Sequence, residues 1–281
     1  MRIKPSFWLA LCFAYVFGFF REFALLLAAV TLHEMAHVIV GLIFHVSVTE
    51  VIITPLGEAA VLKGLDWKNS WVRAAVILAG PAMNLIIGFA GFLVFNISIT
   101  DIAMPDKGFG LGYFFAANIA LGLFNFLPAF PLDGGRFCQL ILGNTIGVAC
   151  SNRLLCHISR VVAVLMIIAG IIQFIRFSYN ISLCLIGLFI IINIRKEQIK
   201  LSFDFFSYFS PRRMAGQRIP IKFYAVTSSA RMEDLIDCLR WNAFSVFNIY
   251  FEDGAVSSFS EKDLMNYIRY NGLTGSVADI P

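Results

Sequence analysis

The run FALLLAAVTLHEMAHVIVGLIF, residues 23–44, decides the fold of this protein. It is long enough to cross a bilayer as a helix, which takes about 20 apolar residues. Near its middle it carries His33, Glu34 and His37. Ionisable side chains at membrane depth are costly and usually mark a functional site. The run therefore predicts a membrane-spanning helix that carries chemistry.

The composition of the whole chain is typical of a membrane protein. Of the 281 residues, 59% are hydrophobic and 14% are charged, whereas a soluble domain carries about 25% charged residues. The net charge of +4 is not gathered into a basic stripe, so we expect no direct binding to nucleic acid. The six cysteines form no CxxC pair, and we expect no disulfide framework.

Six apolar runs are candidate membrane spans. They lie at roughly 5–20, 23–44, 73–96, 109–127, 158–175 and 179–194. An even number of spans places both termini on one side, and most basic loop residues fall on that same side. The positive-inside rule then predicts that both termini are cytoplasmic. We expect an integral, multi-pass α-helical membrane protein.

The composition changes near residue 195. Residues 1–195 form the predicted transmembrane domain, and residues 196–215 mix aromatic and basic side chains, which suits an interfacial linker. Residues 216–281 resemble an ordinary soluble sequence. Their pattern predicts the order strand, helix, strand, strand, helix, and hence a small C-terminal α/β domain.

The residues from His33 to His37 spell HExxH. Positions i and i+4 of a helix share a face, so the two imidazoles can bind one Zn²⁺ ion. Glu34, next to the first of them, can act as a general base toward an attacking water. The alternative is a polar contact between helices, but it would bury three ionisable groups in the membrane without a role.

A catalytic zinc site usually has three protein ligands and one open position. Asp133 is the predicted third ligand, within NFLPAFPLDGGR at residues 125–136. Two prolines there break a helix, and two glycines permit a tight turn after the aspartate. A second interpretation makes Asp133 the cap of the following helix. His45 and His157 are other candidate ligands, without a supporting motif.

Together these motifs resemble the site-2 protease family of intramembrane zinc metalloproteases. The resemblance rests on HExxH, on N-x-x-P-x-x-P-L-D-G-G from Asn125, and on GPAMN at residues 80–84. It implies that His33, His37 and Asp133 bind one zinc ion and that Glu34 is catalytic. It also implies that Asn125 polarises the scissile carbonyl or positions the substrate. Leu132 replaces a proline found in many members, a change that the turn should tolerate.

The segment from Val46 to Leu62 predicts a small membrane-associated β-hairpin. It is rich in β-formers and is interrupted by Pro55, Leu56 and Gly57, a turn signal. We expect the hairpin near the catalytic pocket, where an exposed strand edge could pair with a substrate that has left its helix. An interfacial loop is the alternative.

The order of elements in residues 216–281 resembles a single CBS module. The resemblance implies pairing with a second copy, and hence a homo-oligomer formed through this domain. It also implies binding of ATP or another adenine nucleotide. The alternative is a small dimerisation domain without a ligand.

Within the family, the compact core and the single CBS-like module resemble the branch that processes a pro-sigma factor at stage IV of sporulation. This resemblance implies a membrane-associated protein substrate and membrane-bound inhibitory or regulatory partners. In a spore former it implies the mother-cell membrane around the forespore. One alternative is a site-2 protease that cleaves anti-sigma factors or signal-peptide remnants. Another is a transporter or channel that uses Glu34 and Asp133 as ion sites.

Overall fold

The computed structural model describes residues 2–3, 5–54, 57–63, 65, 69–95, 110–178, 183–194, 220–241, 243–251, 253–271 and 277. The chain forms two compact units, Met1–Leu127 with Leu132–Gly134, and Pro128–Pro131 with Gly135–Pro281. The predicted boundary at residue 195 and the linker at 196–215 lie outside the described residues.

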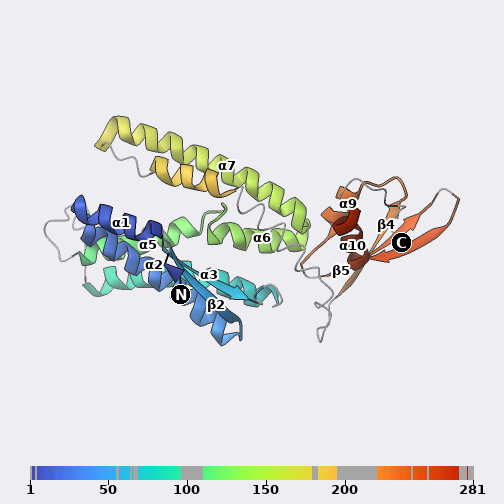
Figure 1. The fold of residues 1–281 in the computed structure, drawn as a ribbon, viewed down its shortest axis with the longest axis horizontal. Helices are drawn as coiled ribbons and strands as arrows, with labels where there is room; N and C mark the ends of the chain where they lie inside the picture. Colours follow the sequence, from blue (N-terminus) through green and yellow to red (C-terminus); the bar gives the residue numbers. More distant parts are fainter. Residues whose placement is uncertain are drawn as a thin grey trace. The chain divides into compact units, whose positions relative to one another are not determined.

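The first unit is built on helices (Figure 1), which are α1 (Pro5–Val16), α2 (Phe20–Ile43), α3 (Ser70–Phe95) and α5 (Leu111–Asn125). Alanine and leucine favour the helix, and a membrane segment must satisfy its own backbone hydrogen bonds. The helices α2, α3 and α5 all contact one another. A side chain at Gly122 would meet Leu85 and the carbonyl of Pro81. This glycine therefore lets α3 and α5 approach closely.

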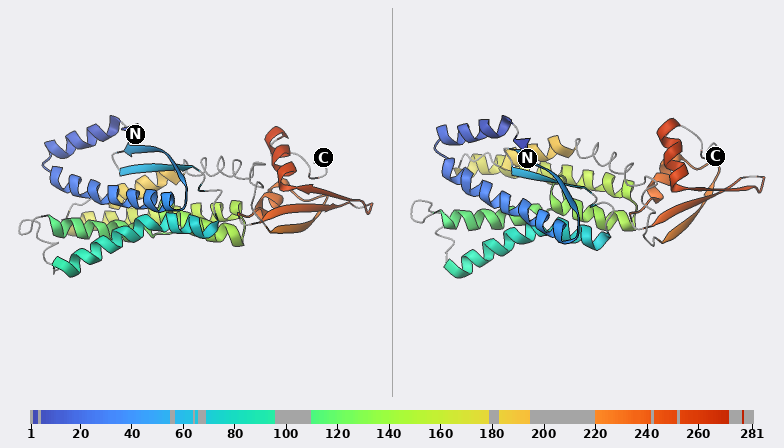
Figure 2. Two further views of the ribbon diagram at one scale, coloured as in Figure 1. Left: turned by 90° about the horizontal axis from the view of Figure 1, so that it is seen from below. Right: turned by 60° about the horizontal axis from the view of Figure 1, so that its bottom comes forward.

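The predicted β-hairpin is confirmed. Strand β2 (Ser47–Thr54) pairs antiparallel with β3 (Gly57–Lys63), while Pro55 and Leu56 of the predicted turn lie outside the described residues. The short strand β1 (Arg2–Ile3) pairs parallel with the other edge of β2. Helix α2 lies between the hairpin and α3 (Figure 2). The hairpin therefore runs beside the helix that carries HExxH.

The second unit contains α6 (Asp133–Thr145), whose first two residues belong to the first unit, and α7 (Val148–Gln173). The π-helical turn η2 (Phe174–Ser178) extends α7, and a further helix spans Leu183–Ile194. Helix α7 begins well before the predicted run at 158, because its first turns are amphipathic. Val148 and Leu155 are buried there while Arg153 is exposed, a pattern that hydropathy alone does not detect.

Among the described residues, three helices are long and apolar enough to cross a membrane, namely Phe20–Ile43, Ser70–Val94 and Val148–Arg176. Leu111–Asn125 and Leu183–Ile194 are apolar but shorter. At 12 residues, α1 is also shorter than the hydrocarbon core, because a helix rises about 1.5 Å per residue. All three shorter helices fall on predicted runs, and crossing by six spans stays a prediction.

The C-terminal part of the second unit has the predicted order of elements. It comprises β4 (Ile221–Thr227), α9 (Met232–Cys238), β5 (Phe244–Tyr250), β6 (Val256–Ser260) and α10 (Glu261–Asn271). Strand β5 lies between β4, which is parallel to it, and β6, which is antiparallel. The sequence pattern predicts a helix from Met232 to Trp241, but α9 ends at Cys238, because Leu239 and Trp241 turn into the core.

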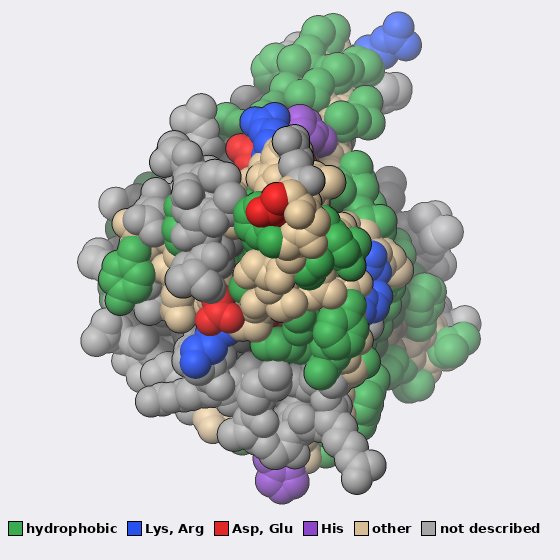
Figure 3. Space-filling view, turned by 90° about the vertical axis from the view of Figure 1, so that its right-hand side faces the viewer, with side chains coloured by type: hydrophobic (Ala, Val, Ile, Leu, Met, Phe, Trp, Pro, Cys, Tyr) green, Lys and Arg blue, Asp and Glu red, His purple; other side chains and the backbone are tan. Residues whose placement is uncertain are grey.

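The outer face of this sheet is apolar. Ile221, Phe223, Tyr250 and Val256 are exposed, while the inner face packs in the core. A view from the C-terminal side shows apolar side chains between isolated charged ones (Figure 3). An apolar area of this kind commonly marks an interaction surface.

The same unit joins its C-terminal elements to the turn between α6 and α7. The backbone N–H of Val148 donates to the carbonyl of Leu239 at 2.9 Å. Arg240 donates to the carbonyl of Asn144 at 3.2 Å, and Arg153 forms an ion pair with Asp237. Val148 also belongs to the hydrophobic core of the C-terminal elements.

Candidate metal centre

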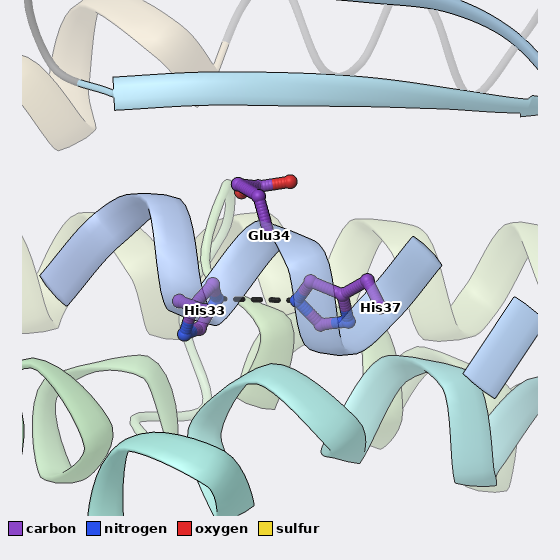
Figure 4. Close-up of side chains that lie close together, drawn as sticks. All are labelled: His33, Glu34 and His37. Atoms are coloured by element: carbon purple, nitrogen blue, oxygen red, sulfur yellow. Dashed lines mark hydrogen bonds between the residues drawn. The ribbon is translucent and has the colours of Figure 1, made fainter. Parts of the chain in front are cut away.

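Helix α2 presents His33 and His37 on one face, as their spacing predicts. Their Nε2 atoms lie 3.1 Å apart, and the residues are only 4% and 8% exposed. Both side chains point to the side of α2 on which α3 lies (Figure 4). The histidine pair is therefore buried against a neighbouring helix.

Asp133 reaches the same place from the first residue of α6. Its Oδ2 atom lies 3.0 Å from Nε2 of His33 and 3.3 Å from Nε2 of His37. The aspartate is 9% exposed. It therefore begins the following helix and also meets the histidine pair, so the two roles considered for it are compatible.

The glycines after Asp133 do not form the predicted tight turn. They lie in the first turn of α6, and a side chain at Gly134 would collide with the carbonyls of Phe126 and Leu127. The glycine is required because the backbone packs closely there, which brings the start of α6 against the end of α5. The predicted tight turn was therefore wrong, because both glycines are helical.

His37 is held by a second contact on its far side. Its Nδ1 atom hydrogen-bonds to the carbonyl oxygen of Val76 in α3, at 2.7 Å. Since a carbonyl only accepts, Nδ1 carries the proton, which leaves the lone pair of Nε2 facing Asp133. This is the tautomer that binds a metal through Nε2, oriented as metal-bound histidines usually are.

Glu34 lies on another face of α2. Figure 4 shows it pointing toward a strand of the hairpin, away from α3. One ligand atom from each of His33, Glu34 and His37 lies within 4.8 Å of the others. The carboxylate is therefore close to the histidine nitrogens while standing apart from the triangle that they form with Asp133.

This triangle fits a zinc ion. Its sides are 3.0, 3.1 and 3.3 Å. Nitrogen and oxygen ligands at about 2.0–2.1 Å in a tetrahedral site stand roughly 3.3 Å from one another. Two imidazoles and one carboxylate are also a common donor set for catalytic zinc, which keeps the fourth position open.

The other predicted site residues are placed differently. The amide of Asn125 donates to the carbonyl of Leu121, one turn back in α5, at 3.0 Å, and no described contact joins it to the histidines. His45 is exposed beyond the end of α2. His157 is exposed and lies 3.5 Å from a guanidinium nitrogen of Arg160. Neither histidine joins the cluster of ligand atoms among the described residues.

Two residues of α3 contact the histidine pair in ways that no sequence pattern predicted. Val76 acts through its backbone, which leaves no side-chain signal. Gly80 lies against both histidine rings, where a side chain would stand 2.7 Å from Nε2 of His33. The element GPAMN contains this glycine, so the motif was visible although its role was not.

Comparisons with known proteins agree with this geometry. The sequence matches Peptidase family M50 over residues 22–105 and 97–169. It is 27% identical over 262 residues to a zinc metalloprotease of Methanocaldococcus jannaschii, an alignment that covers 86% of this chain and 72% of that protein. It is 31% identical over 266 residues to Rip3 of Mycobacterium tuberculosis, covering 91% of this chain and 65% of that protein. The chain thus spans just under two thirds of the length of Rip3.

A sporulation protein and a solved structure are also similar to this chain. Stage IV sporulation protein FB of Bacillus subtilis is 24% identical over 154 residues, covering 55% of this chain and 51% of that protein. The structure of the site-2 protease from Methanocaldococcus jannaschii aligns with a TM-score of 0.54 at 27% identity. This alignment covers 69% of this chain and 88% of that chain.

Proposed function

Because the chain belongs to peptidase family M50, the site-2 protease family of zinc metalloproteases, we propose that it hydrolyses a peptide bond within the membrane. His33, His37 and Asp133 hold one zinc ion, and Glu34 is the general base. The observation that carries this assignment is the triangle of Nε2, Nε2 and Oδ2 atoms with sides of 3.0–3.3 Å.

Each residue has a distinct task in hydrolysis. Zinc, when bound, acts as a Lewis acid that activates water and polarises the scissile carbonyl. Glu34 accepts a proton from the attacking water and returns it to the leaving amine. Its place beside the histidines, within 4.8 Å of their ring nitrogens, supports this task. Burial of the histidine pair excludes bulk water and strengthens the electrostatic interactions there.

Asn125 is proposed to polarise the scissile carbonyl or to position the substrate. It is the last residue of α5 and precedes the broken segment that leads to Asp133. Its amide donates to Leu121, so this role requires the side chain to turn toward the substrate. A carboxamide N–H is a suitable donor for a developing oxyanion.

The hairpin is proposed to present the substrate. It runs beside α2 (Figure 2) and contacts that helix through both strands. Strand β3 is at the edge of its sheet, and no described strand pairs with the side that faces away from β2. A substrate must leave its helical conformation before cleavage, because a helical carbonyl already accepts a hydrogen bond. Pairing with a strand edge would hold the released segment extended.

The most specific substrate that we propose is a membrane-associated pro-sigma factor. Similarity to stage IV sporulation protein FB supports this choice. In a spore former, the protein would then lie in the mother-cell membrane around the forespore, with six spans, cytoplasmic termini and membrane-bound inhibitory partners. Anti-sigma factors and signal-peptide remnants are the alternative substrates within the family.

The C-terminal domain, residues 216–281, is proposed as a cytoplasmic CBS-like module. A docking surface near the membrane raises the local concentration of a substrate. The exposed apolar face of its sheet supports pairing with a second copy, and ATP is its proposed ligand. The truncation that tests this role removes residues 216–281. It should slow cleavage while zinc remains bound. Cleavage at the full-length rate would exclude docking, and absence of nucleotide binding would exclude sensing.

The deciding experiment is co-expression of the protein with candidate pro-sigma factors, comparing wild type with Glu34→Gln. We expect processing only with wild type. Zinc analysis of the purified protein separates a protease from a transporter or channel, because transport through Glu34 and Asp133 needs no zinc. Stoichiometric zinc is the expected result.

A further inference from the structure

The two histidines of the proposed metal centre differ in the hydrogen bonding of their Nδ1 atoms. His37 donates its Nδ1 proton to the carbonyl of Val76. Nδ1 of His33 is also buried, yet it has no hydrogen-bond partner among the described residues. A metal-bound histidine almost always donates its second ring N–H to a partner, which fixes the tautomer and the ring plane. His33 therefore requires an acceptor.

Asn84 of α3 is likewise buried without hydrogen-bond partners among the described residues. It is 0% exposed, and neither its amide oxygen nor its amide nitrogen has a partner among the described residues. Buried polar groups without partners are rare and costly, particularly in a membrane. The amide oxygen of Asn84 is therefore available to accept a hydrogen bond.

The register of α2 and α3 indicates that Asn84 lies toward His33. Val76 contacts His37, and Gly80, four residues later, lies against both His37 and His33. The helices therefore run antiparallel, since the position in α2 falls as the position in α3 rises. Asn84 follows Gly80 by four residues and shares its face. It thus lies one turn further, toward the His33 end of the pair.

Asn118 of α5 provides a comparison within the same unit. It is also 0% exposed, but its amide nitrogen donates to the carbonyl of Phe114 at 2.8 Å, which leaves only its oxygen without a partner. Gly122, one turn later, lies against Leu85 and Pro81 of α3. Asn118 precedes Gly122 by one turn and so lies on the face of α5 that meets α3.

We propose that Asn84 is a positioning residue for His33. Its amide oxygen accepts the Nδ1 proton, directly or through one buried water, and so directs the lone pair of Nε2 toward the metal. Buried waters typically bridge about three such polar groups. This inference rests on the proposed zinc site. It gives His33 a hydrogen-bond partner from α3, as Val76 is the partner of His37.

Two substitutions at one position separate an acceptor from a packing residue. Asn84→Leu keeps the branching of the side chain at Cγ and suits an apolar interior, but it cannot accept a hydrogen bond. Asn84→Asp is poor packing for a membrane helix, yet its carboxyl group accepts. Asn118→Leu is the matched control, because it replaces another fully buried asparagine of the same helix group.

The measurement is the zinc retained by the purified full-length protein after equilibration with chelators of graded affinity. Loss of an outer partner of a metal ligand usually costs about 10–100-fold in metal affinity. We expect a loss of that size in Asn84→Leu, near-normal retention in Asn84→Asp and no change in Asn118→Leu. If Asn84→Leu does not fold, Asn84→Ser and Asn84→Ala replace it as the test pair, because they differ by one oxygen atom. The serine variant should then retain zinc more tightly than the alanine variant.

Three outcomes would overturn the inference. Normal retention in Asn84→Leu would remove the need for an acceptor. Equal loss in Asn84→Leu and Asn84→Asp, or in alanine and serine, would make the residue a packing element. A loss in Asn118→Leu larger than that in Asn84→Leu would assign the role to α5. Failure of wild type itself to bind zinc would refute the proposed function rather than this inference.

Discussion

Gly80 of α3 lies directly against the ring of His33. A methyl group at position 80 would stand 2.7 Å from Nε2 of His33 and closer still to Nε2 of His37. Those nitrogens are the atoms that face Asp133. The absence of a side chain at this position leaves room for both imidazoles, which the proposed metal centre needs.

Gly80→Ala should lower zinc affinity and proteolysis together, because the added methyl group displaces both imidazoles. Zinc content and cleavage of a substrate measure the two effects. Gly88→Ala is the control, since a side chain there would meet Ile119 and the carbonyl of Phe115. It should weaken helix packing without a selective loss of zinc. Normal zinc content in Gly80→Ala would show that the histidines adjust freely.

Glu34→Gln should abolish cleavage while zinc stays bound. Glutamine preserves the shape of the side chain but cannot accept the proton of the attacking water. The expected loss is at least the roughly 10²–10⁴-fold that general base catalysis contributes. Metal analysis and a cleavage assay on the same purified sample give the comparison. Persistent proteolysis would assign the base to another residue.

Asp133→Asn should lower both zinc occupancy and activity, because an amide is a neutral and weaker ligand. The metal content of purified protein is the primary measurement. His45→Ala and His157→Ala are the controls, and both should retain zinc, since these histidines are exposed and outside the cluster. If Asp133→Asn keeps full zinc occupancy and one of the histidine variants loses zinc, that histidine is the third ligand.

The topology can be tested with a phosphatase that is active only outside the cytoplasm. We expect it to be silent when fused after Pro281 and active when fused near Asp101. The reason is the distribution of basic residues, which predicts cytoplasmic termini. The reverse pattern would place both termini outside the cytoplasm.

The C-terminal core should unfold without loss of the metal centre. Phe247 is fully buried between Tyr224 and Phe259, with ring centroids at 5.5 and 5.4 Å. Phe247→Ala should destabilise this part of the protein by about 3–5 kcal/mol. Proteolytic sensitivity of residues 220–281 should rise while zinc content stays constant. Concurrent zinc loss would mean that the metal centre depends on these elements.

Sequence patterns predicted the local elements well, because each depends on near neighbours. The hairpin from Ser47 to Lys63 and the five C-terminal elements follow from β-formers, turn residues and helical periodicity. The errors arose where tertiary contacts prevailed. Leu239 and Trp241 left the predicted helix for the core, and Gly134 took a helical conformation against the end of α5.

The sequence by itself determined that one apolar helix carries His33, Glu34 and His37, since their spacing within a helix is a local property. It also indicated Asp133 by motif. Only the tertiary structure decided that Val76 orients His37, that Gly80 makes room for both rings and that Asn84 is fully buried without a partner among the described residues. These relationships join separate helices, whose register depends on packing of all their side chains at once rather than on any short pattern.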